Sequence, residues 1–379
     1  MSPTWDRRVE GELAAVRDAG RWREPRDLVV AGAVTGMVDG RPVVTFASND
    51  YLGLTHHPAV VAAAHDAVDR WGTGTGASRL VVGSRPLHRE LETELAAWKG
   101  SEAALLFPTG FAANLGLLAA LGGPDVTILS DELNHASIVD GARLARAQVR
   151  VYRHADLDHL AKLLVEVEGP ALVVSDSAFS MDGDVADVAG LVELAASHDA
   201  LLVLDEAHAV LGPVVEIGID KDLPLLRMGT LSKALGSLGG FVAGPRAYVD
   251  LLCNRARPFI FTTAPTPADT AAALAAVRIV RCAEGEALVA RLRHHVDRLR
   301  AGHPTPIVPL VLGDEAGALA AAARLLDQGL LVPAIRPPTV APGTSRLRIT
   351  LSAAHTEDQV DRLLAALAAL PARSGGPAT

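Results

Sequence analysis

Cysteine and lysine are scarce in this sequence of 379 residues. The two cysteines, Cys253 and Cys282, are too far apart for a CxxC pair and match no metal-ligand spacing, so we expect no metal site. No run of five or more lysines and arginines occurs, and the formal net charge is −9. We therefore expect no nucleic-acid partner.

Long apolar segments are also absent. No apolar run approaches the ~18 residues that a membrane-spanning helix requires. Residues 1–22 carry charges throughout and lack the apolar core of a secretory signal peptide. We therefore expect a protein of the cytoplasm that does not enter a membrane.

The middle of the chain alternates short apolar runs with helical patterns. The runs cover residues 103–107, 126–130, 149–153, 171–175, 201–204, 225–229 and 240–244, and the helical patterns include 111–121, 137–147, 157–167 and 188–198. This order is typical of an α/β fold with a mostly parallel sheet and helices on both faces. Ligands of such sheets bind beyond the carboxyl ends of the strands, so the residues that follow a strand are the candidates for chemistry.

The two ends of the chain differ from its middle. Residues 1–47 predict an N-terminal arm with a helix over 6–19 and a hairpin that turns at Asp39-Gly40. Residues 48–264 form the expected large domain, and residues 265–370 form a smaller α+β domain on which the arm packs. The elements expected in the smaller domain are a long helical stretch, rich in alanine and arginine, from Pro265 to about Gly302, strands near 307–312 and 346–351, and a helix over 357–370. Residues 371–379 are expected to be a disordered tail.

The sequence contains only four lysines, and their surroundings differ. Lys99 ends a helical pattern, where a solvated cation that caps the helix is the ordinary interpretation. Lys162 and Lys221 have the polar neighbours of surface charges. Lys233 follows a predicted strand and lies in residues 228–241, which contain no other charged residue. Such surroundings lower the pKa of a lysine and favour Schiff-base formation, although a chance lysine in a glycine-rich loop is the alternative.

Segment 201–208 places a carboxylate and a histidine directly after a strand. Asp205 can pair there with a protonated pyridine nitrogen, and His208 can reach the phenolic oxygen of the same ring. Asp-Glu-Ala-His is also the metal-binding box of a class of helicases, which requires a P-loop that ends in Gly-Lys-Ser/Thr. None of the four lysines stands between a glycine and a serine or threonine, so this class is excluded.

Three further positions after strands suit a phosphorylated aromatic cofactor. Gly110 and Phe111 open a helix, and the backbone N–H groups at such a helix start bind phosphate. Thr230 offers a hydroxyl to the same phosphate. His135 can stack on an aromatic ring, although a structural histidine is the commoner case in this position. The sequence has no GxSxG or HExxH motif, and no GxGxxG motif opens a helix after a strand.

Nine separated segments together resemble the α-oxoamine synthases, a family of fold-type I transferases that depend on pyridoxal 5′-phosphate (PLP). The segments are residues 48–54, 74–79, 88–92, 180–184, 205–208, 229–236, 257–263, 335–340 and 343–352. They have the order found in the family and span nearly the whole chain. The sequence departs from the family pattern in residues 209–213, where the family has a glycine after the Asp-Glu-Ala-His box, and in residues 176–179.

The resemblance implies roles for individual residues around PLP. Lys233 would hold the cofactor and move the Cα proton of the substrate, and Asp205 would pair with the pyridine nitrogen. The other residues expected around the cofactor are His135 on the ring face, His208 and Ser180 at the ring oxygen, and Gly110, Phe111 and Thr230 at the phosphate. Members of the family are homodimers, in which Thr262 and Thr263 would reach the phosphate of the neighbouring subunit.

The resemblance also implies substrates. Arg348 would grip the carboxylate of the amino acid, and the other expected substrate-binding residues are Arg21, Asn49, Ser78, His135, Arg336 and Thr339. The branch that this chain resembles most, chiefly through residues 335–352, acts in biotin synthesis. It joins L-alanine to a pimeloyl thioester of CoA or of acyl carrier protein and releases CO₂.

Other reactions remain open at this point. Members of the same family use glycine with acetyl-CoA or succinyl-CoA, or serine with a long acyl-CoA. Ser78 stands where the 5-aminolevulinate synthases, which use glycine, tend to carry threonine, and this difference favours alanine. A PLP aminotransferase and a catalytically silent PLP-binding scaffold are the more distant alternatives.

Overall fold

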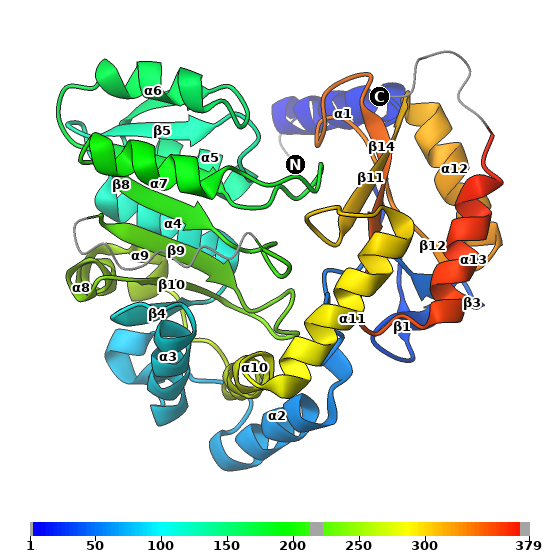
Figure 1. The fold of residues 1–379 in the computed structure, drawn as a ribbon, viewed down its shortest axis with the longest axis horizontal. Helices are drawn as coiled ribbons and strands as arrows, with labels where there is room; N and C mark the ends of the chain where they lie inside the picture. Colours follow the sequence, from blue (N-terminus) through cyan, green and yellow to red (C-terminus); the bar gives the residue numbers. More distant parts are fainter. Residues whose placement is uncertain (1–2, 213–222, 372–379) are drawn as a thin grey trace.

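The computed structural model describes residues 3–212 and 223–371, and its largest element is a seven-stranded sheet (Figure 1). The strands stand in the order β4-β10-β9-β8-β7-β5-β6. Their bounds are Ala103–Phe107 (β4), Thr127–Asp131 (β5), Gln148–Tyr152 (β6), Ala171–Asp176 (β7), Leu201–Asp205 (β8), Leu225–Thr230 (β9) and Gly240–Gly244 (β10). Neighbouring strands pair in parallel except at β10, which is antiparallel to both β4 and β9.

The predicted α/β fold with a mostly parallel sheet is therefore confirmed. Each of the seven predicted strands is present, and its bounds shift by no more than one residue. Strands β4, β5 and β10 are buried over their whole length. Helices cover both faces of such a sheet, so its strands read as continuous apolar runs rather than as alternating patterns.

Helices on the two faces of the sheet enclose separate cores. Helices α4, α5, α8 and α9 pack on one face, and α3, α6, α7 and α10 (Pro267–Val280) pack on the other. The bounds of the helices in this part are Pro58–Trp71 (α2), Pro86–Trp98 (α3), Gly110–Leu121 (α4), Ala136–Leu144 (α5), Leu157–Val165 (α6), Val188–Ser197 (α7), Arg246–Arg255 (α8) and Arg257–Ile260 (α9). Several begin at a capping side chain: Thr109, Asp156 and Asp187 accept hydrogen bonds from the first turns of α4, α6 and α7.

The remaining elements form a second part beside the large sheet (Figure 1). Its two sheets have the orders β11-β14-β13 and β1-β2-β3-β12. The strands are Val29–Val30 (β1), Thr35–Val38 (β2), Arg41–Thr45 (β3), Ile307–Gly313 (β11), Leu330–Leu331 (β12), Ala334–Ile335 (β13) and Ser345–Thr350 (β14), and the helices include Pro3–Asp18 (α1), Glu315–Asp327 (α12) and Glu357–Ala368 (α13). Strand β3 pairs in parallel with β12, so the two ends of the chain share one sheet. The domain boundaries themselves stay a prediction.

The hairpin between β2 and β3 turns at Asp39-Gly40, where the sequence predicts it. Both residues have a positive φ, 51° for Asp39 and 73° for Gly40. This backbone is typical of a type I′ turn, whose twist matches that of the strands it joins. A short polar residue followed by glycine tolerates these angles, so the local sequence alone was sufficient for the prediction.

The long helical stretch expected after Pro265 is divided in the structure. The chain forms two helices there, α10 (Pro267–Val280) and α11 (Ala283–Leu299). Helix α10 packs on α2 and α3, whereas α11 packs on α13. The break lies at Arg281 and Cys282, and the backbone is extended at Cys282.

Some expectations concern residues outside the described part of the chain. Lys221, Pro213 and residues 372–379 of the expected tail lie there. Within residues 3–212 and 223–371, no helix has the length and apolar character needed to cross a membrane.

Candidate active site

Three neighbouring strands of the large sheet end in aspartate. Asp131, Asp176 and Asp205 are the last residues of β5, β7 and β8, and all three are buried. Asp205 accepts hydrogen bonds from Nδ2 of Asn114 at 2.8 Å and from the backbone N–H of Ala207 at 2.9 Å. These donors hold a carboxylate at the carboxyl edge of the sheet, where a ligand is expected to bind.

Lys233 lies in the loop after β9, and its Nζ is 2.8 Å from Nε2 of His208. Burial lowers the pKa of Lys233, although the negative charges of Asp205 and Asp176 oppose this effect. Among the described residues, the amine forms its hydrogen bond with a histidine ring rather than with a carboxylate. A buried lysine with a lowered pKa supplies the neutral amine that attacks a carbonyl group.

His208 belongs to a chain of hydrogen-bonded side chains. Burial, together with the positive charges of Lys233 and Arg348, holds the pKa of His208 well below its usual value, so its ring is neutral. Nδ1 of His208 is 2.5 Å from Oη of Tyr51, and that hydroxyl donates to Oδ1 of Asn49 at 3.2 Å. Nη2 of Arg348 donates to the same Oδ1, also at 3.2 Å. Three side chains thus connect Lys233 with Arg348.

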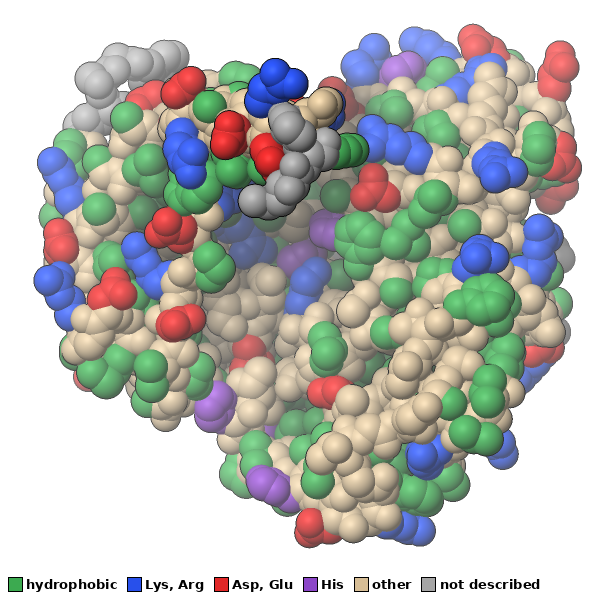
Figure 2. Space-filling model, turned by 180° about the vertical axis from the view of Figure 1, so that it is seen from behind, with side chains coloured by type: hydrophobic (Ala, Val, Ile, Leu, Met, Phe, Trp, Pro, Cys, Tyr) green, Lys and Arg blue, Asp and Glu red, His purple; other side chains and the backbone are tan. Residues whose placement is uncertain are grey.

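Arg348 reaches this chain from β14, in the second part of the molecule. Its Nε donates to the carbonyl oxygen of Ser180 at 2.6 Å, and its Nη1 donates to Oγ1 of Thr350 at 3.0 Å. A guanidinium has five N–H groups, and three of them make these bonds and the one to Asn49. Figure 2 shows a hollow between the two parts, with histidine and basic side chains inside it.

His135 precedes helix α5 beside the same aspartates. Its backbone N–H donates to Oδ2 of Asp176 at 3.0 Å. Burial lowers the pKa of His135, while the charges of Asp205 and Lys233 act on it in opposite directions. The ring of Phe111 meets the imidazole edge to face, with the ring centroids 6.3 Å apart. A neutral imidazole therefore lies close to both Asp205 and Lys233.

Helix α4 begins directly after β4 at Gly110. Oγ1 of Thr109 caps it by accepting a hydrogen bond from the N–H of Ala112 at 3.0 Å. The side chain of Thr230 lies against this helix start. A Cβ atom built on Gly110 would be only 3.3 Å from Oγ1 of Thr230. The first N–H groups of a helix have no partner within the helix, so this end of α4 can bind a phosphate with help from the threonine hydroxyl.

These residues fit PLP. They offer an amine for covalent attachment, a buried carboxylate for the pyridine nitrogen and a helix N-terminus for the phosphate, all at one edge of the sheet. When bound, PLP supplies a conjugated, protonated ring that withdraws electrons from the Cα atom of an attached amino acid. Within the part of the chain that the structure describes, no group of three or more His, Cys, Asp or Glu is placed to hold a metal ion.

The threonines expected at the phosphate of a neighbouring subunit lie elsewhere. Thr262 and Thr263 are exposed, and Thr263 pairs with Ser78 through an isolated β-bridge. In the described part of this single chain, neither threonine is hydrogen-bonded to Lys233. Their place on the surface leaves both side chains accessible to a second subunit.

Arg21 and Arg336 come together from opposite ends of the chain. Nη2 of Arg21 is 3.4 Å from Oε1 of Glu315, and Nη1 of Arg336 is 3.7 Å from Oε2 of the same residue. Arg336 also donates to the carbonyl oxygen of Gly20 at 3.0 Å. Thr339 is exposed and donates its N–H to the carbonyl oxygen of Arg336. This group is separate from the hydrogen-bonded chain of Lys233 in the described structure.

Sequence reasoning missed three residues that support the site. Asp176 ends a strand as Asp205 does, and burial together with the charge of Asp205 raises the pKa of Asp176 well above its usual value. Asn114 is the one polar side chain in the apolar sequence of α4, and it holds Asp205. Both signals could have been found in the sequence. Tyr51 gives no such signal, because its contact with His208 joins residues 157 positions apart.

The prediction that Lys99 is a solvated charge is wrong. Lys99 does follow α3 as its C-cap, but its Nζ pairs with Oε2 of Glu206 at 2.7 Å. Only 15% of the Lys99 side chain and 9% of the Glu206 side chain are exposed. Glu206 also pairs with Arg227 at 3.0 Å, and these three residues line a pocket of about 230 Å³ together with Trp98. The helical pattern before Lys99 could not reveal a partner on a distant strand.

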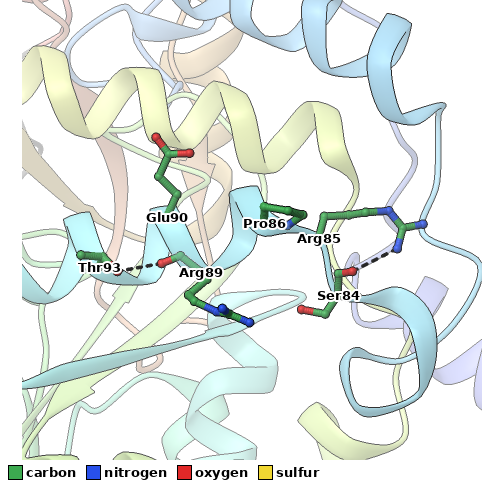
Figure 3. Close-up of a pocket in the computed structure, with 6 residues that line it drawn as sticks. All are labelled: Ser84, Arg85, Pro86, Arg89, Glu90 and Thr93. Carbon is green, nitrogen blue, oxygen red and sulfur yellow. Dashed lines mark hydrogen bonds between the residues drawn. The ribbon is translucent and has the colours of Figure 1, made fainter.

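Another pocket, of about 410 Å³, lies at the start of α3 (Figure 3). Its lining residues are Ser84, Arg85, Pro86, Arg89, Glu90 and Thr93. The two arginines extend in different directions, and none of the residues predicted to act in chemistry lines this pocket. It therefore lacks the convergent groups found at the strand ends.

Known proteins share both the sequence and the fold. Residues 41–367 match the family model for aminotransferase class I and II. The 8-amino-7-oxononanoate synthase of Anaeromyxobacter dehalogenans is 50% identical over 96% of this chain and 95% of that protein, and the one of Methylobacterium nodulans is 47% identical over 98% of each. The structure of serine palmitoyltransferase from S. paucimobilis with bound PLP and myriocin is 30% identical and covers 96% of each chain with a TM-score of 0.88.

The solved 8-amino-7-oxononanoate synthase of Francisella tularensis also has this fold. It is 25% identical, covers 86% of this chain and 96% of its own, and has a TM-score of 0.72. The predicted family, fold type and PLP dependence are confirmed by this agreement. The chain belongs to the aminotransferase class I and II family and, within it, to the 8-amino-7-oxononanoate synthases, which are PLP-dependent acyltransferases.

Proposed function

We propose that this chain joins L-alanine to a pimeloyl thioester, releases CO₂ and forms 8-amino-7-oxononanoate with PLP attached to Lys233. The observation that carries the proposal is the amine of Lys233, which burial keeps reactive at the same sheet edge as the carboxylate of Asp205. The product is the one named in the descriptions of the curated relatives. The cytoplasmic location stays a prediction.

Asp205 and Lys233 divide the proton chemistry. Asp205 carries the negative charge that keeps the pyridine nitrogen protonated, and Asn114 fixes the direction of that carboxylate through its 2.8 Å bond. The amine of Lys233 removes the proton from Cα of alanine and returns a proton after CO₂ has left. His135 would lie on the face of the ring, and because burial lowers its pKa, the imidazole would add no charge there.

Arg348 binds the carboxylate of alanine. Its two terminal nitrogens belong to one planar fork, whose geometry matches the two oxygens of a carboxylate. The bonds to Ser180, Thr350 and Asn49 fix the orientation of the guanidinium before a substrate arrives. A preoriented fork loses little freedom on binding, so it favours one position of the amino acid.

The other proposed contacts surround these two centres. Ser180 and His208 bind around the ring oxygen, and Gly110, Phe111 and Thr230 bind the phosphate. Asn49 and Ser78 lie on the amino-acid side, and Arg21, Arg336 and Thr339 lie along the path of the acyl chain. The basic pair Arg21 and Arg336, which one carboxylate holds together, suits an acidic group on the thioester or on its carrier.

We further propose that the chain acts as a homodimer with its active site at the interface. The exposed Thr262 and Thr263 would then bind the phosphate of the partner subunit. Large apolar side chains near them in the sequence and at the Ser78 bridge are also exposed, namely Val81 (71%), Val82 (70%) and Phe261 (69%). Apolar surface of this kind is typical of an interface between proteins.

Mass spectrometry of the product tests the reaction. The PLP-loaded enzyme is given L-alanine, glycine or L-serine, each with acetyl-, succinyl-, pimeloyl- or palmitoyl-CoA, and with pimeloyl-acyl carrier protein. We expect 8-amino-7-oxononanoate from alanine and pimeloyl thioester, with CO₂ from the alanine carboxylate. Faster turnover of glycine with a short acyl-CoA, or of serine with palmitoyl-CoA, would reject the proposed substrates. A Lys233→Ala variant gives the background.

A further inference from the structure

A series of buried hydrogen bonds connects Asp205 with the imidazole of His135. Nδ2 of Asn114 donates to Oδ2 of Asp205 at 2.8 Å and to Oγ of Ser137 at 2.9 Å. Oγ of Ser137 lies 2.7 Å from Nδ1 of His135. Asn114 and Ser137 are each only 1% exposed, so these contacts are shielded from water. One amide group of helix α4 thus joins the carboxylate expected at the pyridine nitrogen to the imidazole expected on the ring face.

The direction of each hydrogen bond in this series is fixed by groups that can only donate. The nitrogen of the Asn114 amide faces Asp205, because the amide oxygen in its place would be repelled by the carboxylate. This orientation leaves Oδ1 of Asn114 without a partner among the described residues. Such a loss costs less than contact between the amide oxygen and a charged oxygen.

The second fixed donor is the backbone N–H of Ser137. It donates to Nδ1 of His135 at 3.2 Å, and a backbone N–H cannot accept, so Nδ1 carries a lone pair. The hydroxyl of Ser137 accepts a hydrogen bond from Asn114 and therefore donates its own proton to the same Nδ1. The neutral ring then has its proton on Nε2.

The start of helix α5 favours the neutral ring. His135 is the N-cap residue of α5, and its side chain accepts a hydrogen bond from the first turn, where N–H groups have no partner within the helix. An imidazolium has an N–H on both ring nitrogens and would turn one of them toward these donors. Partial burial acts in the same direction and lowers the pKa of His135, while the charges of Asp205 and Lys233 oppose each other. Asp176 accepts the backbone N–H of His135.

We propose that Ser137 is a positioning residue whose hydroxyl holds the imidazole of His135 neutral, with its proton on Nε2 and its plane fixed, beside the cofactor ring. Asn114 directs that hydroxyl, because its N–H uses the oxygen as acceptor and leaves the hydroxyl proton for Nδ1. A neutral ring of fixed orientation adds no charge beside a protonated pyridine and loses little freedom when the cofactor binds. The inference rests on the proposed place of His135 on the ring face and adds the residues that set it there.

The position of the proton can be read by ¹⁵N NMR of the histidine-labelled apoprotein, because protonated and unprotonated ring nitrogens have distinct shifts. The chain has 13 histidines, so a His135→Asn sample, which keeps a capping side chain, assigns the signal. We expect a lone pair on Nδ1 and the proton on Nε2. A proton on Nδ1 of the neutral ring would overturn the proposal.

Removal of the hydroxyl tests its effect on the charge of the ring. Ser137→Ala deletes one donor to Nδ1 but keeps the backbone N–H. The neutral form loses a hydrogen bond, so the affinity of His135 for a second proton should rise by about threefold to tenfold in an NMR pH titration of the apoprotein. An unchanged titration would overturn the proposal. The matched control is Thr270→Val, which removes an equally buried hydroxyl that donates to the carbonyl oxygen of Thr266 and should leave the titration of His135 unchanged.

A double-mutant cycle tests the part of Asn114. Asn114→Leu removes the donor that orders Ser137 and keeps a side chain of similar size in the apolar helix α4. The hydroxyl is then free to turn away from Nδ1, so Ser137→Ala should change the His135 titration less in this background than in the wild-type protein. Equal changes in the two backgrounds would contradict the role of Asn114.

The affinity for PLP tests the fixed orientation apart from the charge. Equilibrium dialysis of PLP with the apoprotein is carried out at pH 8.5, where we expect a neutral imidazole with or without the hydroxyl. Ser137→Ala should bind PLP about twofold to tenfold more weakly, because a ring that is free to turn loses this freedom when the cofactor binds. Thr270→Val should match the wild-type affinity, and wild-type affinity in Ser137→Ala would overturn the positioning role. None of these measurements uses alanine or a thioester, so an error in the proposed substrates would leave them unchanged.

Discussion

Lys99 and Lys233 lie on different sides of the end of strand β8, and their partners differ. Nζ of Lys99 pairs with the carboxylate of Glu206 at 2.7 Å and lies 4.1 Å from the centre of the Trp98 ring. Nζ of Lys233 faces the neutral ring of His208 instead. Asp205 is the last residue of β8 and Glu206 follows it, and consecutive side chains of an extended backbone point to opposite sides. Glu206 thus contacts Lys99 directly, whereas its neighbour Asp205 acts on Lys233 through its charge.

The comparison shows what makes a buried lysine reactive. Glu206 touches both Lys99 and Arg227, so its charge is neutralised by direct contacts. Asp205 is bound to Asn114 and to a backbone N–H, and it acts on Lys233 only through its field. A direct carboxylate partner favours the ammonium form of a lysine, whereas burial without one lowers its pKa. We conclude that Lys233 suits chemistry because, among the described residues, its amine contacts the His208 ring and no carboxylate.

Replacement of Asp205 is expected to have the largest effect on chemistry. Asp205→Asn keeps the size of the side chain but removes the charge that holds the pyridine nitrogen protonated. Several kcal/mol of lost stabilisation correspond to a loss of about a thousandfold or more in rate. We expect a folded protein that binds PLP covalently but barely exchanges the Cα proton of alanine in D₂O, as measured by NMR.

Glu206→Gln is the matched control, because it removes the neighbouring charge on the other side of the strand. Its exchange rate per bound PLP should equal that of the wild-type enzyme. If Asp205→Asn also exchanges at a near-normal rate, Asp205 merely caps the turn and has no role in withdrawing electrons.

Replacement of Arg348 is expected to have an intermediate effect. Arg348→Lys keeps the positive charge but loses the planar fork. A charge-assisted pair of this kind contributes roughly 1.5–3 kcal/mol, so alanine affinity should fall by about tenfold to a hundredfold while PLP stays bound. A spectroscopic titration of the holoenzyme with alanine measures the change. Unchanged affinity would transfer the role to Arg336 or Arg346, and Arg346→Lys is the control.

Replacement of Lys99 is expected to change stability but not chemistry. Lys99→Met leaves Glu206 paired with Arg227. The free energy of unfolding should therefore fall by about 1–2 kcal/mol, which is less than the cost of leaving a buried charge with no partner. Urea unfolding of the variant and the wild-type protein measures the difference. PLP content and exchange rate per folded molecule should be unchanged. A loss of covalently bound PLP in Lys99→Met would contradict the comparison between the two lysines.

The smallest expected effect is the contribution of a third basic side chain, His154, to the free energy of unfolding. His154 bridges Asp131 at 2.9 Å and Asp184 at 2.7 Å, and these hydrogen bonds raise its pKa to about 10 from 6.5. A raised folded pKa means that the stabilisation is complete below about pH 6.5 and is lost as the pH rises through 10. We expect the free energy of unfolding to fall by about 1 kcal/mol between pH 7 and pH 10. The change is small because His154 and Asp184 are partly exposed. Urea unfolding at pH 7 and pH 10 should show it in the wild-type protein but not in His154→Gln.

The sequence predicted the parts of the fold that local patterns determine. Apolar runs gave all seven strands of the large sheet, and the Asp39-Gly40 pair gave the turn between β2 and β3. The break between α10 and α11 could not be predicted, because it depends on which distant helices each one contacts. The alanine-rich sequence carries no strong stop signal there.

In the candidate site, too, residues that depend on distant contacts could not be predicted. Lys233, Asp205 and His208 follow strands and were therefore predicted from their positions. Tyr51 and the partner of Lys99 depend on contacts between residues far apart in the sequence, 157 positions for Tyr51 and His208 and 107 for Lys99 and Glu206. Fold topology alone brings such residues together, so one sequence without the structure cannot identify them.

The position of covalently bound PLP tests the central claim most directly. Borohydride reduction of the holoenzyme fixes the cofactor on the lysine that carries it, and peptide mass spectrometry then identifies that lysine. We expect the phosphopyridoxyl group on the peptide that contains Lys233. Labelling of Lys99, Lys162 or Lys221 in its place would contradict the account.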